Sequence, residues 1–285
     1  MRILPSILGV ALAMVSACAQ EKSDLSMRAP GAAELPPPSP SLSITPYNST
    51  PRPPRVPSQF NSVRTSRRII ALTFDDGPHP GLTPRLLDIL RQQGIRATFF
   101  VVGRNVDAHP EIARRIVAEG HEIANHTWSH PDLTKLGEQA LRREMEDTSA
   151  AIERVTGRRA TIMRPPYGAI NQRTREVLTK DHNLDVVLWS VDPLDWRKPG
   201  PSVVTQRLVD GATPGGILLA HDIQAGTIEA MPETIAQLKA KGYAFATVSQ
   251  LLALREDPRP PVVPAGPAAA QPGNAAEQEA PAAAR

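Results

Sequence analysis

Apolar and polar positions along residues 67–256 follow a repeating order, in which a short apolar run precedes a segment with one apolar face. The apolar runs predict strands near 69–74, 96–102, 121–125, 160–164, 184–191, 216–220 and 243–247. The amphipathic segments predict helices near 82–93, 110–119, 137–156, 171–181, 201–210, 228–241 and 249–255. Strands that alternate with helices predict an α/β fold with a parallel sheet. Seven such units favour a closed or nearly closed (β/α) barrel, although a doubly wound open sheet fits the same alternation.

The first apolar run ends in two adjacent carboxylates. Asp75 and Asp76 follow a buried-strand pattern and come directly before Gly77 and Pro78. Neighbouring side chains of a regular strand point to opposite faces, so both carboxylates can share one site only if the extended backbone ends there. The glycine–proline pair favours such a break, and a turn with two solvated aspartates is the alternative.

The two ends of the chain differ in composition from its middle. Of the 285 residues 30 are prolines, which are concentrated in residues 19–66 and 257–285. Segments of this kind bury too little apolar surface to offset their ordering entropy. We therefore expect a Pro-rich disordered linker at 19–66, one folded domain at 67–256 and a disordered Pro/Ala-rich tail at 257–285. The formal net charge is +3, and the basic residues are scattered along the chain rather than clustered. This distribution gives no indication of a nucleic-acid partner.

Residues 1–18 predict export. Arg2 precedes a short apolar run, and small residues precede Cys18, which is the order of a signal peptide rather than of a membrane-spanning helix. The stretch VSAC at 15–18 resembles a bacterial lipoprotein signal, in which the cysteine is lipidated; an ordinary cleaved signal is the alternative. Cys18 is the only cysteine in the sequence and has no disulfide partner. We expect a lipoprotein anchored in the cell envelope and facing the periplasm, with the linker as its tether, or otherwise a periplasmic or secreted protein.

Polar side chains follow several of the predicted strands at the point where each strand ends. They are Asp75, Asp76, His126, His130, Arg164, Asp192, Asp195 and His221. In either parallel architecture the carboxyl ends of the strands converge on one rim, where sites are built. We expect these residues to face a shared site.

Two of these residues have the spacing of metal ligands. His126 and His130 are four residues apart, and on a helical turn two such imidazoles meet on one side. With a carboxylate from Asp75 or Asp76 the set is typical of an open catalytic zinc site, and it also fits a non-haem iron oxygenase. The second carboxylate favours hydrolysis, because an activated water needs a neighbouring base and oxygen activation does not.

Hydrolysis of an amide also needs an acid, because the amine leaving group must be protonated. His221 can fill this role at the end of its predicted strand, and Asp192 or Asp195 could orient it. Arg164 lies in a proline-rich turn, where pairing with a surface carboxylate is the alternative to a role in the site.

Five motifs occur in the order of the polysaccharide deacetylase family, also called the NodB homology domain or carbohydrate esterase family four. They are TFDDG at 73–77, HTWSH at 126–130, RPPYG at 164–168, DPLDW at 192–196 and LAH at 219–221. The chain resembles this family over residues 67–255. The resemblance implies a distorted (β/α) barrel with seven strands, the number of units in the sequence pattern.

The resemblance also implies how the first three motifs act. Asp75 would be the general base, and Asp76, His126 and His130 would bind the metal. That metal would be a divalent cation, zinc in the usual case and cobalt or another divalent ion in related enzymes. Arg164 would orient the base.

The remaining roles implied by the resemblance fall on the acid and on the substrate pocket. His221 would be the general acid, tuned by Asp195. The backbone N–H of Tyr167 would help to hold the oxyanion, and Trp196 and Leu219 would line the acetyl pocket.

The activity implied is metal-dependent removal of N-acetyl groups from an amino-sugar polysaccharide, with release of acetate. Peptidoglycan and chitin-like oligosaccharides are candidate substrates, and a secreted exopolysaccharide fits the same chemistry. An O-acetyl esterase acting on a polymer such as xylan is the first alternative. A non-catalytic glycan-binding module is the second, but it would not need the metal and base positions that this sequence retains. We expect a monomer.

Overall fold

The structure is a computed structural model and describes residues 59–255. The predicted signal segment with Cys18, the linker as far as residue 58, and the tail at 257–285 lie outside the described residues. Among residues 59–255, no helix combines the length and the apolar character needed to cross a bilayer.

The strands form one eight-stranded sheet in which every pair of neighbours is parallel. Its order is β1-β6-β5-β4-β3-β2-β7, and β8 pairs with β2. The strands are β1 (Gln59–Phe60), β2 (Ile69–Asp75), β3 (Thr98–Val101), β4 (Glu122–Asn125), β5 (Ile162–Met163), β6 (Asp185–Val187), β7 (Ile217–His221) and β8 (Ala244–Phe245). A parallel bridge between Val191 and Leu218 brings the chain after β6 against β7. The sheet therefore curls round, as the distorted (β/α) barrel predicts, and the open doubly wound sheet is not found.

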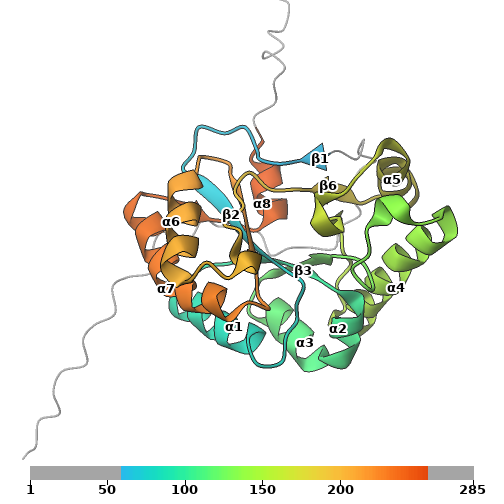
Figure 1. Cartoon of the computed structure of the whole chain (residues 1–285), viewed down its shortest axis with the longest axis horizontal. Coiled ribbons are helices and arrows are strands. Elements are labelled where there is room, and N and C mark those ends of the chain that lie inside the picture. Colours follow the sequence, from blue (N-terminus) through green and yellow to red (C-terminus); the bar gives the residue numbers. More distant parts are fainter. Residues whose placement is uncertain (1–58, 256–285) are drawn as a thin grey trace, which may run out of the picture. The chain divides into compact units, whose positions relative to one another are not determined.

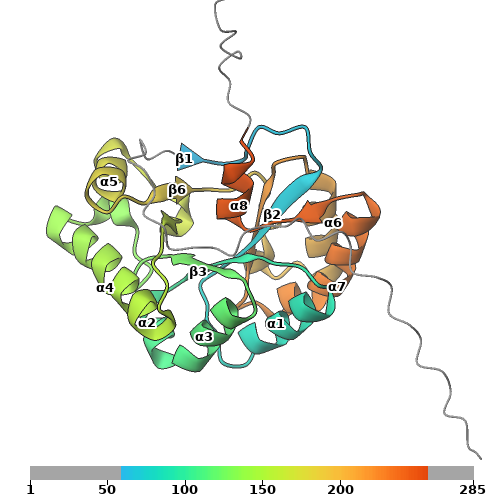
Figure 2. The same cartoon turned by 180° about the vertical axis from the view of Figure 1, so that it is seen from behind.

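Helices surround the curled strands in both views (Figures 1 and 2). They are α1 (Thr83–Gln92), α2 (Gly103–Ala108), α3 (Pro110–Ala118), α4 (Glu138–Thr156), α5 (Gln172–Glu176), α6 (Pro201–Gly211), α7 (Ala225–Ala240) and α8 (Val248–Ala253). A π-helical turn (Val177–Asp181) continues α5. Each predicted helix is present within a few residues of its expected bounds, whereas α2 was not predicted.

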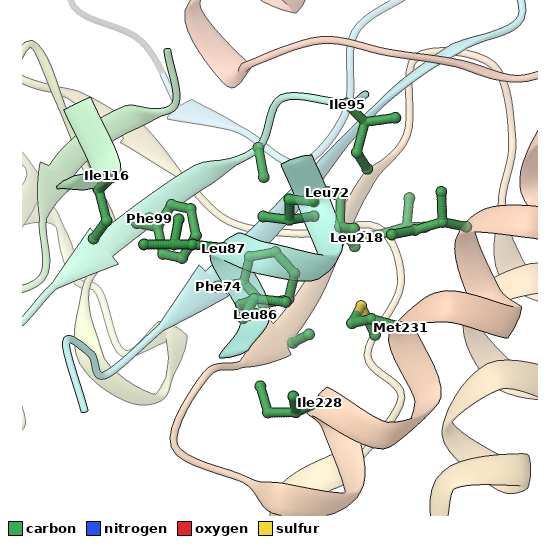
Figure 3. Close-up of a cluster of buried hydrophobic side chains, with 14 of the residues drawn as sticks. Leu72, Phe74, Leu86, Leu87, Ile95, Phe99, Ile116, Leu218, Ile228 and Met231 are labelled. Carbon is green, nitrogen blue, oxygen red and sulfur yellow. The ribbon is translucent and has the colours of Figure 1, made fainter. Parts of the chain in front are cut away.

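Strand β2 separates two apolar clusters. Leu72 and Phe74 face outward and pack against the surrounding helices, where they lie near Leu86 and Leu87 of α1 and Met231 of α7 (Figure 3). The alternate positions face the inside of the curled sheet. There Ile69 and Ala71 share a cluster with Val248, Leu251 and Leu252 of α8, which lies at the end where β2 begins. The same alternation directs Thr73 and Asp75 to the interior at the other end of the strand.

The predicted boundary between linker and domain at residue 66 is wrong. Residues 59–60 form β1 beside β6, and the N–H of Val63 donates to the carbonyl of Gly215 at 2.8 Å. Phe60 and Val63 are buried. Composition missed this segment because it holds only two large apolar side chains, and their burial depends on residues far along the chain.

Candidate functional site

Asp75 and Asp76 reach the same site because the extended backbone of β2 ends between them. Asp76 has a φ of +77°, in the left-handed region, which breaks the alternation of the strand. As a result His126 Nε2 lies 3.4 Å from Oδ1 of Asp76 and 3.8 Å from Oδ2 of Asp75. The structure places the two carboxylates as the sequence predicted for a shared site.

The two histidines lie on a tight loop after β4, and the helical turn expected from their spacing is not formed. Thr127 and His130 have left-handed backbone conformations, with φ of 70° and 64°. Side chains close the loop locally, because Asn125 Oδ1 accepts from the Thr127 N–H at 2.8 Å and the Thr127 hydroxyl accepts from the His130 N–H at 3.0 Å. The rings of His126 and His130 still meet, with centroids 5.0 Å apart.

Two helices hold this loop from outside. The N–H of Gly103, at the start of α2, donates to the Thr127 carbonyl at 2.9 Å. Glu144 of α4 accepts from the N–H groups of Trp128 and Ser129 at 2.8 and 2.9 Å. Sequence reasoning missed Glu144, since nothing in an amphipathic helix distinguishes one exposed-face glutamate from another.

Three side chains offer donor atoms to one point. Atoms of Asp76, His126 and His130 all lie within 4.8 Å of one another. The Nδ1 atom of His126 lies 2.7 Å from the carbonyl of Arg164, and donation there leaves the Nε2 lone pair directed at Asp76. Oδ1 of Asp76 is buried and has no hydrogen-bond partner within residues 59–255.

The charge state of Asp76 suits a cation. Burial raises the pKa of this carboxyl group, but its interaction with His126 and the charges of His130 and His221 outweigh burial and lower the pKa to about 2. The carboxyl group is therefore ionised at neutral pH. An ionised carboxylate with two imidazole nitrogens is a donor set that fits a divalent transition metal such as zinc.

Arg164 is completely buried and fixes Asp75. Its guanidinium donates to Oδ1 of Asp75 at 2.7 Å and to the Thr73 hydroxyl at 2.8 Å. Further bonds reach the carbonyls of Val187 and Leu188, so the guanidinium makes four hydrogen bonds in all. Burial lowers the pKa of Arg164 and Asp75 opposes this shift. The alternative of pairing with a surface carboxylate is not found.

His221 lies beside Asp75, because these residues are register partners on the neighbouring strands β7 and β2. Its Nδ1 atom is 2.7 Å from Oδ1 of Asp195, which also accepts the backbone N–H of His221 through Oδ2 at 2.8 Å. Burial lowers the pKa of His221, but Asp195 outweighs burial and raises the pKa to about 9. Asp192 instead accepts the N–H of Leu194 at 2.8 Å, so the partner of His221 is Asp195.

The three remaining candidates lie around this group. Among residues 59–255, the exposed large hydrophobic side chains are Tyr167 and Trp196. The Tyr167 ring packs edge-on against His130, with centroids 4.8 Å apart, and its backbone is left-handed at φ 61°. Trp196 directly follows Asp195. Leu219 is buried in β7 two residues before His221, which puts both side chains on the inner face of the strand.

Comparison with known proteins agrees with this geometry. Residues 62–187 match the family model described as polysaccharide deacetylase. The chain is 40% identical over 198 residues to the peptidoglycan-N-acetylglucosamine deacetylase PgdA of Listeria monocytogenes, an overlap of 70% of this chain and 41% of that protein. It is 40% identical over 197 residues to a chitooligosaccharide deacetylase of Rhizobium leguminosarum bv. trifolii, covering 68% of this chain and 87% of that protein.

A solved structure of similar fold is that of the peptidoglycan N-acetylglucosamine deacetylase Bc1960 in complex with an N-hydroxybenzamide. It superposes with a TM-score of 0.66 at 36% identity, covering 69% of this chain and 92% of that one. The chain spans only about two fifths of the length of the first curated relatives it matches, 41% and 40% in the Listeria monocytogenes and Bacillus subtilis proteins.

Proposed function

The chain belongs to the polysaccharide deacetylase family, and on this basis we propose that it hydrolyses N-acetyl groups of an amino-sugar polysaccharide and releases acetate. The observation that carries the proposal is that the donor set Asp76, His126 and His130 lies beside a carboxylate and an imidazolium. Oδ2 of Asp75 is 3.8 Å from Nε2 of His126, and His221 is the register partner of Asp75 on the neighbouring strand. A base and an acid that can both reach one electrophile are what amide hydrolysis requires.

Asp75 is the general base in this proposal. Arg164 occupies one of its oxygens, so Oδ2 is free to take a proton from the attacking water. Because the arginine is buried and three other acceptors hold it, its bond keeps the Asp75 carboxylate directed at the site.

Asp76, His126 and His130 would hold a divalent cation, most simply Zn²⁺, with Co²⁺ or another divalent ion as alternatives. When bound there, the cation supplies Lewis-acid chemistry, which polarises the acetyl carbonyl and lowers the pKa of water. The backbone N–H of Tyr167 supplies a further donor for the charge that develops on the carbonyl oxygen.

His221 is the general acid. With a pKa near 9 it carries a proton at Nε2 at neutral pH, and Asp195 keeps the ring in place through Nδ1. As the carbon–nitrogen bond of the amide breaks, the proton passes from Nε2 to the departing nitrogen, and the acetyl group leaves as acetate. The neutral imidazole is then ready to be reprotonated.

The polysaccharide is peptidoglycan or a chitin-like oligosaccharide, classes named for the relatives of this chain. Tyr167 and Trp196 provide apolar rings at the rim, against which sugar faces can stack. An O-acetyl esterase acting on acetylated xylan is the second candidate, since an ester passes through the same site with less need for the acid.

The test is acetate release by the purified protein, measured on N-acetylglucosamine oligomers, peptidoglycan and acetylated xylan. Each substrate is assayed after chelation and again after addition of Zn²⁺ or Co²⁺. We expect release from an N-acetylated polymer that chelation abolishes and metal restores. Release from acetylated xylan alone would favour the esterase, and no release from any substrate would leave a glycan-binding module.

For location, we propose a monomeric lipoprotein that Cys18 anchors in the cell envelope. The proposal is supported by the apolar run, the VSAC stretch and the Pro-rich segment that follows. Cys18→Ala should move the mature protein from the membrane to the soluble fraction without changing its specific activity. A mature N-terminus without acyl chains in the wild-type protein, seen by mass spectrometry, would contradict the anchor.

A further inference from the structure

One buried acid next to the site has no part in the mechanism above. Asp222 directly follows His221 at the end of β7 and is completely buried. Its Oδ2 accepts from the Thr83 hydroxyl at 2.5 Å, whereas Oδ1 is buried without a hydrogen-bond partner in the described part of the chain. A buried carboxyl group with only one strong partner is costly, which calls for an explanation of its position.

The carboxyl group of Asp222 lies against the turn that carries Asp76. A Cβ atom added at Gly77 would lie 2.6 Å from Cγ of Asp222 and would overlap both of its oxygens. The Asp222 carboxyl group therefore occupies the space that a side chain at residue 77 would need. It packs against the backbone of Gly77, which directly follows the candidate metal ligand Asp76.

A second link runs through Thr83, the first residue of α1. Its hydroxyl accepts from the N–H of His79 at 2.7 Å while it donates to Asp222. Asp222 therefore supports both ends of the turn at 76–79, by contact at Gly77 and through Thr83 at His79.

The opposite side of the same turn is held by the region of α2. Asn105 Nδ2 donates to the carbonyl of Asp76 at 2.8 Å, and the N–H of Val102 donates to the carbonyl of Gly77 at 2.9 Å. With those bonds on one side, the Asp222 side chain packs against the turn from the side of β7.

We propose that Asp222 is a positioning residue, which holds the turn of Asp76 against the end of β7 and thereby sets the distance between Asp76 and His221. The proposal rests on the proposed function, in which these two groups act on one acetyl group. Since Asp222 and His221 are consecutive, a movement of the turn away from Asp222 is also a movement away from the acid.

The charge of Asp222 fits a steric and hydrogen-bonding role. Burial, together with Asp76 and Asp75, raises the pKa of Asp222 to about 7, although the Thr83 hydrogen bond opposes this shift. Near neutral pH a substantial fraction of the Asp222 carboxyl group is therefore protonated, and this form keeps its contact with Thr83 without adding a third negative charge to the site. Asparagine, which is neutral and of the same shape, should therefore replace it.

The experiment compares Asp222→Ala, Asp222→Asn, Gly77→Ala and the double variant Gly77→Ala with Asp222→Ala. For each protein kcat and KM are measured, together with the Zn²⁺ affinity of the metal-free protein against a competing chelator. Asp222→Ala should lower both kcat and Zn²⁺ affinity by about 10- to 100-fold with little change in KM. Asp222→Asn should stay within about 3-fold of wild type for both.

The double variant tests directly whether Gly77 and Asp222 act through the same contact. Gly77→Ala alone should impair Zn²⁺ binding, because its methyl group displaces the Asp222 carboxyl group. With Asp222→Ala the methyl group enters vacated space, so the combined loss should be smaller than the product of the single losses. Thr83→Val, which removes the hydroxyl and keeps the shape, should give a weaker loss in the same direction if Asp222→Ala does not fold.

Glu122→Ala is the matched control. Glu122 is also a buried acid that accepts a threonine hydroxyl, from Thr98 at 2.9 Å, but it lies at the opposite end of β4 from the histidine loop. Glu122→Ala should lower the melting temperature and leave Zn²⁺ affinity unchanged.

Three outcomes would each overturn the proposal. They are equal Zn²⁺ affinity in Asp222→Ala and wild type, a loss in Asp222→Asn as large as in Asp222→Ala, and fully multiplicative losses in the double variant. A wild-type protein that binds Zn²⁺ but releases no acetate would refute the proposed function, and the affinity arm would still decide the role of Asp222.

Discussion

Asp195→Asn should shift the pH range in which the protein works. The Asp195 carboxylate accepts from the His221 ring at 2.7 Å, from the His221 N–H at 2.8 Å and from the Thr227 hydroxyl at 2.6 Å. An amide in its place has one acceptor oxygen and no charge. Burial of the imidazole is then opposed by Asp75 and Asp76 but no longer by Asp195, and the pKa of His221 should fall from about 9 toward its ordinary value of 6.5.

The loss of activity in Asp195→Asn should depend on pH, because pH sets the fraction of His221 that is protonated. The difference between a pKa of about 9 and 6.5 corresponds to about 3 kcal/mol in favour of the imidazolium. At pH 8 about nine tenths of His221 is protonated in the wild type, and about 3% would be protonated in the variant. The active fraction thus falls about 30-fold at pH 8, but by less than about 2-fold at pH 6.

The assay is the pH profile of kcat/KM for acetate release from an N-acetylglucosamine oligomer, between pH 5.5 and 10. Asp192→Asn is the control, because Asp192 accepts a backbone N–H and does not touch His221. The alkaline limit should move down in Asp195→Asn and stay in place in Asp192→Asn. A wild-type alkaline limit in Asp195→Asn would contradict the role of Asp195. An equal loss of activity at pH 6 and at pH 8 would do the same, because simple misplacement of the His221 ring would cause it.

The stability of the folded protein should also depend on pH through the protonation of His221. The pKa of His221 is raised in the folded protein, so its contribution is complete below about pH 6.5 and is lost as the pH rises through about 9. The difference in melting temperature between wild type and Asp195→Asn should therefore be larger at pH 6 than at pH 10. An equal difference at both values would show that Asp195 stabilises the fold by other means.

Three further predictions follow from the site and the boundary of the domain. Asp76→Asn should lose metal as well as activity, while Asp75→Asn should keep metal and lose turnover by about 10²- to 10⁴-fold, as metal content and acetate release would reveal; the reverse pattern would exchange the two roles. Glu144→Gln, which weakens the bonds to the histidine loop, should reduce Zn²⁺ affinity by about 10-fold with little change in melting temperature, and an unchanged affinity would mean that α2 alone holds the loop. Deletion of residues 1–58 should leave the melting temperature of the domain unchanged, but deletion of residues 1–66 should cost up to about 3 to 6 kcal/mol, because two buried apolar side chains are lost; equal stability of the two proteins would restore the original boundary.

Local sequence was sufficient for the order of all strands and helices except β1 and α2, and for the edge of the sheet at which the site lies. The apolar run along Ile69–Asp75 and the spacing of buried residues in α4, such as Leu141, Met145 and Ile152, depend on residues that are neighbours in the chain. Parallel strands joined by helices then bring every strand end to the same edge. Asp75, His126 and His221 could therefore be assigned to one site before any contact was known.

Local sequence also indicated that the backbone must break after Asp75, since two adjacent carboxylates cannot otherwise share a site. The backbone conformation of the loop that carries His126 and His130 could not be predicted from the sequence. Spacing alone indicated a helical turn, whereas Asn125 and the amides of α2 stabilise left-handed residues there instead. A competing set of hydrogen bonds from distant elements decided the local conformation.

The choice of partners belongs to the tertiary structure. Asp192 and Asp195 have similar surroundings in the sequence, and only the packing of β7 beside this loop pairs His221 with Asp195. Phe60 joins the core because β6 offers it an edge, and Asp222 meets Thr83 across 139 residues. Side-chain chemistry and hydrophobic period are properties of a segment, but a hydrogen bond or a buried contact requires two segments to approach within a few ångströms, and that distance is set only when the whole sheet has closed around its core.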